Sequence, residues 1–305
     1  MISNPSTIHP VPRALEPSRG LLMRIEAGRP LLVGVVNITP DSFSDGGRFL
    51  DPPSAVLQAL KLADEGADLL DLGAESTRPG GGVYGAGASA VAVDEEIARL
   101  LPVLERLRPL TGLPLSIDTR KAAVAAAALA AGADLINDVS GLGDPRMAEV
   151  VRESGCPIVL MHSRGELATM QRGISFHDLV GEVRYELAEL AGRAMDAGIA
   201  RQRIVLDPGL GFGKRGEQNL ELLRRLPELV ELGFPILVGA SRKSFLGEVG
   251  GAPAAERLPA SLAPAAVAAR GGARLLRVHD VAATRRFLDC LDRIERATES
   301  SRPSP

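Results

Sequence analysis

Polar and charged side chains recur along this chain, each directly after a short apolar run of the kind that forms a buried strand. An Asp or Asn in such a place is most often a helix cap or a turn former, so no single member indicates chemistry. Capping does not account for Lys243, Arg277 and His279, and the whole set is therefore a candidate site. In chain order its members are Asn37, Glu75, Ser76, Thr77, Arg78, Asp118, Asn137, Asp138, His162, Asp207, Arg242, Lys243, Arg277 and His279.

One group within this set could bind an anion. Asn37 follows the first apolar run, and Arg277 and His279 end the last one. The first and last strands are neighbours when a sheet closes into a barrel, so these three side chains would offer neutral and cationic donors to one ligand. A phosphate-type group is the natural occupant, and loops near the last strands of such barrels often bind phosphate.

A second group is rich in carboxylates. Asp118, Asn137 and Asp207, with Lys243, could bind a planar heterocycle that carries N–H donors and a carbonyl acceptor, because carboxylates pair well with amidine-like edges. The alternative is an internal ion-pair network between Lys243 and one of the aspartates, which would also shift pKa values.

The strands that must position these side chains are eight apolar runs without polar alternation, as expected for strands buried on both faces. They are 31–37, 68–74, 114–118, 134–138, 157–162, 203–207, 235–239 and 273–279. Amphipathic segments with apolar spacings of three and four lie between them and predict helices. One stripe is Ile97, Leu100, Leu101, Leu104 and Leu107, and another is Leu220, Leu223, Leu226 and Val230.

Eight alternating strands and helices predict an α/β fold, either an open doubly wound sheet or a closed TIM (β/α)8 barrel. No GxGxxG turn follows the first strand, and polar residues stand at nearly every strand end, which favours the barrel with its active site at the C-terminal face. We expect one barrel domain over 31–297. Residues 1–30 and 298–305 are rich in Pro, Ser or other polar residues and are predicted to be weakly ordered extensions.

Composition excludes several classes of protein. A net charge of −3 without a long basic run argues against nucleic-acid binding. The two cysteines, Cys156 and Cys290, are far apart and suggest neither a disulfide framework nor a thiolate zinc site. No signal-peptide pattern and no apolar run of about 18 residues is present, so no export and no membrane insertion is expected. The sequence predicts a soluble cytoplasmic protein.

Two glycine-rich stretches, 45–47 and 79–87, predict loops that cover the same face, although a tolerated surface insertion is an equal alternative for the second. The segment DPGLGFGK (207–214) lacks the GxxxxGK[ST] spacing and is not a P-loop.

Seven motifs occur in one order along the chain: VNITPDSFSDGG (36–47), ESTRPG (75–80), SIDTRK (116–121), INDVSG (136–141), DPGLGFGK (207–214), GASRKSF (239–245) and RVHDV (277–281). In this combination the chain resembles the dihydropteroate synthases over about 31–281. The resemblance implies a transferase of folate biosynthesis, the target of sulfonamides. Its members condense 6-hydroxymethyl-7,8-dihydropterin diphosphate with p-aminobenzoate to 7,8-dihydropteroate and diphosphate, use Mg²⁺ and form homodimers.

The resemblance also implies roles for individual residues. The pterin-binding positions are Asp118, Asn137, Asp207 and Lys243. The diphosphate positions are Asn37, Thr77, Arg277 and His279, with Asn37 also beside the metal. The p-aminobenzoate positions are Phe43, Pro79, Phe212 and Ser244, and the catalytic set is Lys243, Arg277, His279, Asp45 and Arg78.

The chain departs from the family pattern in two loops. Glu166-Leu167 stands where Thr-Pro is common, and the loop after 75–80 is longer and richer in Gly and Ala than expected. These differences leave open a non-catalytic paralogue that binds a pterin. A methyltetrahydrofolate:corrinoid methyltransferase would keep the pterin positions, but has no reason to keep the SRK and RVHDV segments.

Overall fold

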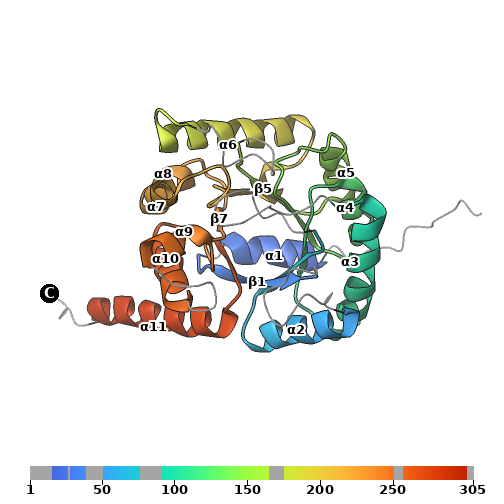
Figure 1. The fold of residues 1–305 in the computed structure, drawn as a ribbon, viewed down its shortest axis with the longest axis horizontal. Helices are drawn as coiled ribbons and strands as arrows, with labels where there is room; N and C mark the ends of the chain where they lie inside the picture. Colours follow the sequence, from blue (N-terminus) through green and yellow to red (C-terminus); the bar gives the residue numbers. More distant parts are fainter. Residues whose placement is uncertain are drawn as a thin grey trace, which may run out of the picture.

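The computed structural model describes residues 16–26, 28–38, 51–75, 91–164, 175–250 and 257–300. Within them, eight parallel strands form the nearly closed barrel that the sequence predicts, and helices surround it (Figure 1). The strands are β1 (Leu31–Asn37), β2 (Leu69–Gly73), β3 (Leu115–Asp118), β4 (Leu135–Asp138), β5 (Ile158–Met161), β6 (Ile204–Asp207), β7 (Leu237–Val238) and β8 (Leu275–Val278).

The strand order is β6-β5-β4-β3-β2-β1-β8-β7, so the first and last strands are neighbours, as the anion-binding group requires. In this β1–β8 pair, Leu31 lies opposite Leu275. The remaining gap, between β6 and β7, is bridged by the pairing of Leu206 with Ile236 and by a 2.9 Å hydrogen bond from the Leu206 amide to the Pro235 carbonyl. The barrel therefore closes, with its thinnest seam at β7.

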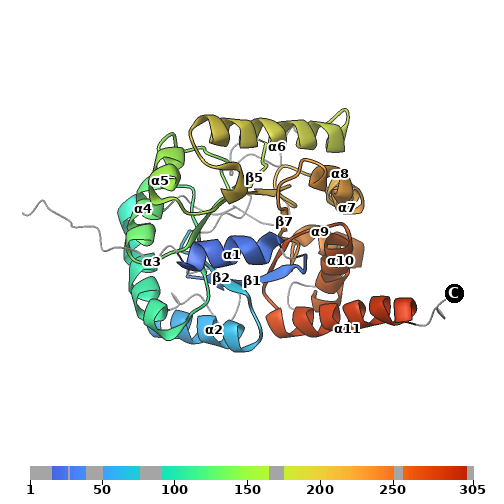
Figure 2. The same cartoon turned by 180° about the vertical axis from the view of Figure 1, so that it is seen from behind.

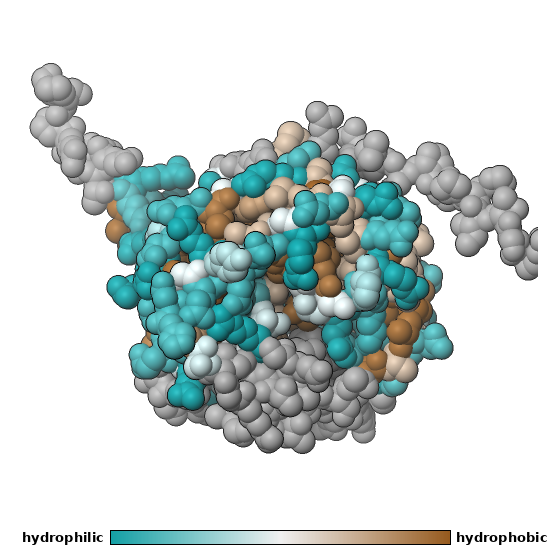
Figure 3. Space-filling model, turned by 90° about the horizontal axis from the view of Figure 1, so that it is seen from above, coloured by the Kyte–Doolittle hydropathy of each residue, from teal (hydrophilic) through white to brown (hydrophobic). Residues whose placement is uncertain are grey.

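Helices cover the outside of the barrel, and one crosses its end. They are α1 (Glu16–Glu26), α2 (Pro52–Asp64), α3 (Val93–Leu107), η2 (Arg108–Leu110), α4 (Ala122–Ala130), α5 (Met147–Ser154), α6 (Leu179–Asp196), η3 (Arg201–Arg203), α7 (Gly216–Arg224), α8 (Leu226–Val230), α9 (Ser244–Gly250), α10 (Leu258–Arg270) and α11 (Val281–Ser300). None of the described helices combines the length and apolarity needed to cross a lipid bilayer. The side that carries α6 is mostly hydrophilic, with smaller hydrophobic areas (Figure 3).

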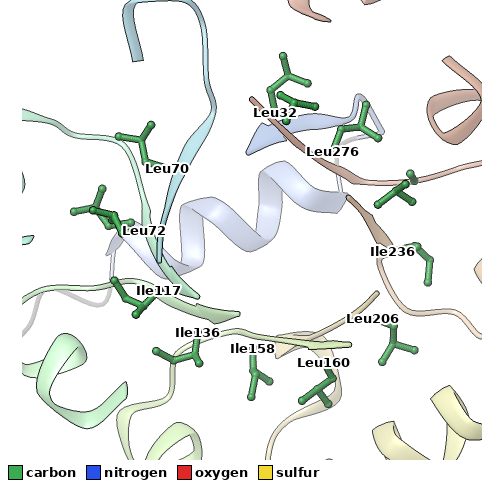
Figure 4. Packing of buried hydrophobic residues seen from close by; sticks show 14 of the residues in the cluster. Leu32, Leu70, Leu72, Ile117, Ile136, Ile158, Leu160, Leu206, Ile236 and Leu276 are labelled. Carbon is green, nitrogen blue, oxygen red and sulfur yellow. The ribbon is translucent and has the colours of Figure 1, made fainter. Parts of the chain in front are cut away.

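Alternation along each strand separates two apolar layers, because successive side chains point to opposite faces. The outward layer packs under the helices and includes the labelled side chains of Figure 4, such as Leu70 and Leu72 of β2. The two predicted helix stripes face this layer, with Leu100 and Leu104 fully buried.

The inward side chains form two further layers inside the barrel. The lower apolar layer, near the strand N-termini, consists of Leu31, Val33, Leu69, Leu135, Val159, Val205, Leu237 and Leu275. The upper polar layer, toward the strand C-termini, consists of Asp71, Ser116, Asp118, Asn137, Asp207 and Arg277. Apolar packing thus holds the strands at one end of the barrel, and polar side chains are gathered at the other.

Helix α1 closes the lower end of the barrel (Figure 2). Its Leu21 and Ile25 are each 1% exposed and join the lower apolar layer, and Arg24 pairs with Asp68 at 2.5 Å. This part of residues 1–30 is a docked helix and not the weakly ordered segment expected from its Pro and Ser content. At the other terminus, α11 continues into the segment predicted as a tail.

Candidate active site

The structure brings the two predicted groups together at the carboxyl ends of the strands. Asp118 and Asp207 end β3 and β6, Asn137 is the last residue but one of β4, and each is at most 7% exposed. Arg277, on β8, reaches Asp118 and has 22% of its side chain exposed. These four residues form the centre of the candidate site.

Arg277 holds the centre of this site. Its Nη2 donates to Oδ2 of Asp118 at 2.8 Å, and its Nε donates to Oδ2 of Asp71 at 2.6 Å. Burial disfavours the charged guanidinium, but Asp71 and Asp118 outweigh this effect and raise the pKa of Arg277. Arg277 thus makes the ion pairs of this cluster. The alternative considered from the sequence was an ion-pair network between Lys243 and one of the aspartates.

Asp71 is a further residue of the site that the sequence pattern did not predict. It lies in the middle of β2, is 0% exposed, and accepts hydrogen bonds from Ser116, Asn137 and Arg277. A charged residue inside an otherwise apolar strand was the available signal, because such a residue is almost never fully buried unless it is paired.

Two buried acceptor atoms in the site have no hydrogen-bond partner within the described part of the chain. They are Oδ1 of Asp118 and Oδ1 of Asn137. Buried polar atoms in folded proteins are nearly always hydrogen-bonded, and an unmade bond costs about 1–3 kcal/mol. A pair of such acceptors on neighbouring strands is suited to a ligand that brings N–H donors.

The site's carboxylates are held in an environment that favours their protonated forms. Burial raises the pKa of Asp118 to about 7, against the nearby Arg277 and with the help of Asp71. Burial also raises the pKa of Asp207, with Lys243 acting in the opposite direction. N–H donors from a ligand would stabilise the ionised carboxylates. Such a ligand binds most strongly where the protein itself does not supply these donors.

Lys243 lies at the edge of the same cluster. Its Nζ donates to the carbonyl of Leu210 and is 4.4 Å from the ring centroid of Phe212, within cation–π range. Burial lowers the pKa of Lys243 to about 8, although Asp207 acts against this shift. Phe212, implied for p-aminobenzoate, and Lys243, implied for the pterin, are therefore in contact.

The loop that carries Phe212 is fixed from below by Lys214. This fully buried ammonium donates to the carbonyls of Gly209 (3.1 Å) and Phe212 (2.9 Å) and to Nδ1 of His162 (2.9 Å). Burial lowers the pKa of Lys214 to about 7. Oδ1 of Asp207 accepts the Gly209 amide at 2.7 Å, so the loop is also tied to the β6 carboxylate. In the sequence, Lys214 ends the segment DPGLGFGK, which lacks the P-loop spacing and is one of the seven family motifs, but no role was predicted for this lysine.

His162 is a neutral link in this support. Burial, with the Lys214 charge adding to it, lowers the pKa of His162 to about 4. Since Nδ1 accepts from Lys214, the ring proton is on Nε2, 2.8 Å from Oε2 of Glu186 on α6. The residue is thus a buried connector between the loop and α6.

The strand ends of β7 and β8 are joined beside the site. Arg242 forms a bidentate ion pair with Asp280, at 2.9 and 2.5 Å, and adopts a left-handed φ of 59° that is uncommon for a non-glycine residue. Oγ of Ser241 lies 3.2 Å from both the amide and Nδ1 of His279. Ser244 is buried at the start of α9, next to Lys243.

Asn37 ends β1 and is half-buried, opposite Gly73 of β2. Glu75 follows β2 and accepts from Arg120 at 2.8 and 3.1 Å. Burial alone would raise the pKa of Glu75, but the hydrogen bonds from Arg120 and Lys121 lower it to about 2. Glu75 is therefore an ionised support at the base of the mouth.

Five residues implied by the resemblance lie outside the described residues. They are Phe43, Asp45, Thr77, Arg78 and Pro79. The two departures from the family pattern, within 79–90 and at Glu166-Leu167, also lie outside the described residues.

Comparison with known proteins agrees with this geometry. The family described as "Pterin binding enzyme" matches residues 33–279. The dihydropteroate synthase of Synechocystis sp. is 44% identical over 270 residues, which cover 88% of this chain and 91% of that protein. The probable bifunctional folylpolyglutamate synthase/dihydropteroate synthase of Haloferax volcanii is 49% identical over 250 residues, 82% of this chain but 29% of that protein.

A solved structure gives the same relation in three dimensions. The dihydropteroate synthase of Xanthomonas albilineans, in complex with 7,8-dihydropteroate, has a TM-score of 0.77 and 43% sequence identity, covering 90% of this chain and 95% of that one. The chain therefore belongs to the pterin-binding enzymes, in the family of the dihydropteroate synthases.

Proposed function

We propose that this chain joins p-aminobenzoate to 6-hydroxymethyl-7,8-dihydropterin diphosphate, forming 7,8-dihydropteroate and releasing diphosphate, in the upper polar layer of the barrel. The observation that carries the proposal is the pair of unpartnered acceptors, Oδ1 of Asp118 and Oδ1 of Asn137. A pterin ring offers N–H donors along its edge, and these could satisfy both acceptors within a carboxylate-lined mouth.

In this proposal the pterin lies among Asp118, Asn137 and Asp207, with Lys243 completing the set. The two aspartates accept from the ring donors, and each such bond favours the ionised carboxylate, against the effect of burial. The Lys243 ammonium, beside Asp207, can donate to a ring acceptor. The ring is thereby held in one orientation, with its methylene group toward β8.

The diphosphate is assigned to the β1 and β8 side of the mouth. Arg277 lies in β8 and His279 follows that strand, and β8 pairs with β1, whose last residue is Asn37. As the bond between the methylene carbon and the diphosphate oxygen lengthens, its electron pair moves to that oxygen, and these donors stabilise the growing charge. The electron-rich pterin stabilises the carbon, so we infer a dissociative displacement.

Mg²⁺ fits this arrangement as a partner of the diphosphate. Asn37 offers one neutral amide oxygen, and the described residues contain no group of three His, Cys, Asp or Glu side chains that could hold a metal ion by themselves. Mg²⁺ commonly keeps several waters and binds through substrate phosphates with few protein ligands. When bound, it would neutralise part of the diphosphate charge.

The amine of p-aminobenzoate attacks the methylene carbon, forming the C–N bond, and its proton leaves to solvent or to the departing diphosphate. An arylamine is neutral at pH 7, so the protein needs no strong base and contributes mainly by positioning. We assign this role to Phe212, Lys243 and Ser244, because Lys214 fixes the loop that carries Phe212 beside Lys243. Phe43, Pro79, Asp45, Thr77 and Arg78 are proposed to complete the site.

We further propose that the protein is a homodimer, assembled through the outer helices. Val267 of α10 and Ile294 of α11 are large apolar side chains left exposed on neighbouring helices. Size-exclusion chromatography with light scattering should give twice the chain mass of 32.0 kDa. A species of single chain mass at all concentrations would contradict the proposal.

The proposed compartment is the cytoplasm. Cys156 is buried and Cys290 is exposed, and both are in the reduced form. A reducing environment keeps cysteines in this form.

The proposed reaction is tested directly by incubating the purified protein with the pterin diphosphate, p-aminobenzoate and Mg²⁺. We expect dihydropteroate and diphosphate to form in equal amounts, and we expect chelation of the metal to abolish the reaction. Pterin binding without product would indicate the non-catalytic paralogue, and absence of pterin binding would refute the assignment of the upper polar layer.

A further inference from the structure

Asp71 is a buried carboxylate whose two oxygens have different tasks. Within the described part of the chain, Oδ1 accepts from the Ser116 hydroxyl alone, at 2.6 Å, whereas Oδ2 accepts from both Asn137 Nδ2 (3.2 Å) and Arg277 Nε (2.6 Å). The side chain is 0% exposed, and on β2 it lies opposite Ser116, two residues before the position opposite Asp118. It therefore contacts two residues of the ligand site while lying beneath them.

This arrangement decides which way the Asn137 amide faces. An ionised carboxylate can only accept hydrogen bonds, so Asn137 must turn its NH₂ group toward Asp71. The opposite orientation would place two acceptor oxygens against each other. As a result, Oδ1 of Asn137 is the atom left without a partner. Without Asp71, the amide could present either a donor or an acceptor to the ligand.

The same oxygen also holds one edge of the Arg277 guanidinium. With Nε bound to Asp71 and Nη2 bound to Asp118, the planar group is fixed by two carboxylates from adjacent strands. The contact leaves Asp118 with one oxygen engaged and Oδ1 unpartnered. Both unpartnered acceptors of the site are thus set by the Asp71–Arg277–Asp118 bridge and its bond to Asn137.

We propose that Asp71 is a positioning residue that fixes the donor and acceptor pattern of the pterin pocket, chiefly by making Asn137 present its oxygen to the ring. This inference rests on the proposed function, because it takes the ligand to be a heterocycle that donates N–H groups. The competing explanation is that Asp71 serves only as a counter-ion that allows Arg277 to be buried.

Two substitutions separate orientation from charge. In Asp71→Asn, the amide oxygen can take the place of Oδ2 and accept from Asn137 and Arg277, while its NH₂ faces Ser116, whose hydroxyl can rotate to accept. The charge is lost and the orientation is kept. Asp71→Leu has a similar volume but accepts nothing, so both are lost. Ser116→Ala is the matched control, since it removes one hydrogen bond of Asp71 on the side away from Asn137 and Arg277.

The probe is 6-hydroxymethyl-7,8-dihydropterin without its diphosphate, titrated by calorimetry into each folded variant. We expect Asp71→Leu to weaken binding about 10-fold or more, and Asp71→Asn and Ser116→Ala to remain within about threefold of the wild type, because one hydrogen bond to a buried acceptor corresponds to about 1–3 kcal/mol. In an Asn137→Ala background, Asp71→Leu should cost little more. Such non-additivity would show that Asp71 acts on pterin binding through Asn137.

A counter-ion role gives the opposite pattern. Asp71→Asn would then weaken binding as much as Asp71→Leu, the two effects would add to that of Asn137→Ala, and affinity for inorganic diphosphate, which depends on Arg277, would fall with them. Should Asp71→Leu fail to fold, equal pterin affinity in Asp71→Asn and the wild type supports orientation, and a loss of 10-fold or more overturns it. If the wild type does not bind the pterin probe at all, the proposed function itself fails.

Discussion

Replacing Asp118 by Asn should change how the stability of this protein depends on pH. Asp118 is 7% exposed in the upper polar layer, and burial raises its pKa to about 7 from an ordinary value of 3.8. The unfolded chain loses this proton near pH 4, whereas the folded protein keeps it until about pH 7. Between these values the folded state binds one more proton, so this group makes the free energy of unfolding fall as pH rises.

The size of the effect follows from the width of that window. One proton changes the free energy of unfolding by about 1.4 kcal/mol per pH unit. Over roughly three units, the wild type should lose about 4 kcal/mol relative to Asp118→Asn, which cannot titrate there. The side chain is almost fully enclosed, so solvent screening removes little of this value, and the pKa of about 7 already contains the opposing effect of the Arg277 charge.

Urea denaturation at half-unit steps from pH 4 to pH 9 measures this difference. The quantity to plot is the free energy of unfolding of the wild type minus that of Asp118→Asn. It should fall steadily to about pH 7 and be level above it. Asp94→Asn is a matched control, because it removes a carboxylate from the exposed first turn of α3 and leaves the buried site unchanged.

A difference that is flat between pH 5 and pH 7 would show that Asp118 is ionised in the free protein, and would refute the account of its burial given above. A rise with pH would mean that Arg277 dominates over burial. In either case the unpartnered Oδ1 would need another explanation, such as a bound water or cation that compensates the charge.

Three further predictions address the loop, the cluster edge and the lower layer. Gly209→Ala should destabilise the protein by more than about 2 kcal/mol in urea denaturation. The φ of Gly209 is 65°, and an added Cβ would lie 1.9 Å from the His162 carbonyl oxygen. Gly192→Ala is the control, because its added Cβ would meet no neighbouring atom within 4 Å, and it should be neutral or stabilising. Lys243→Ala should lower kcat/KM at least about 100-fold with a near-normal thermal midpoint, and wild-type kinetics would remove Lys243 from the site. Leu21→Ala should cost about 2–5 kcal/mol of stability and leave pterin affinity unchanged on titration, since α1 packs at the opposite end of the barrel.

The strands could be predicted from the sequence because each is a continuous apolar run, and all eight were found within two residues of their observed limits. One helix start is harder to predict. Asp144-Pro145 has the sequence pattern of an N-cap followed by Pro at the first helical position, yet α5 begins at Met147. One oxygen of Asp144 accepts the Arg146 amide, and the other accepts the Ala122 amide at the start of α4. The sequence could not show that this cap is shared with a helix 22 residues earlier.

The strand-end residues of the site were predictable, whereas its supports were not. Position after a strand identifies Asp118, Asn137 and Asp207, because the barrel places every such residue at one face. Asp71 and Lys214 act from below that face, and their roles depend on strand register and on a left-handed loop. Both faces of the strands are buried, and Asp71 stands between two leucines in the sequence, so no polar and apolar alternation shows that it points inward.

The two inner layers of the barrel explain how one fold combines stability with an unsatisfied site. The upper layer contains two unpartnered acceptors, Oδ1 of Asp118 and Oδ1 of Asn137, each of which destabilises the free protein by about 1–3 kcal/mol. The lower layer, with α1 packed beneath it, is fully apolar and offsets that cost far from the ligand. A ligand that donates to both acceptors removes this destabilisation when it binds. Relief of the destabilisation therefore contributes part of the binding free energy. Substitutions that satisfy these atoms from within should therefore stabilise the fold and weaken the pterin site together.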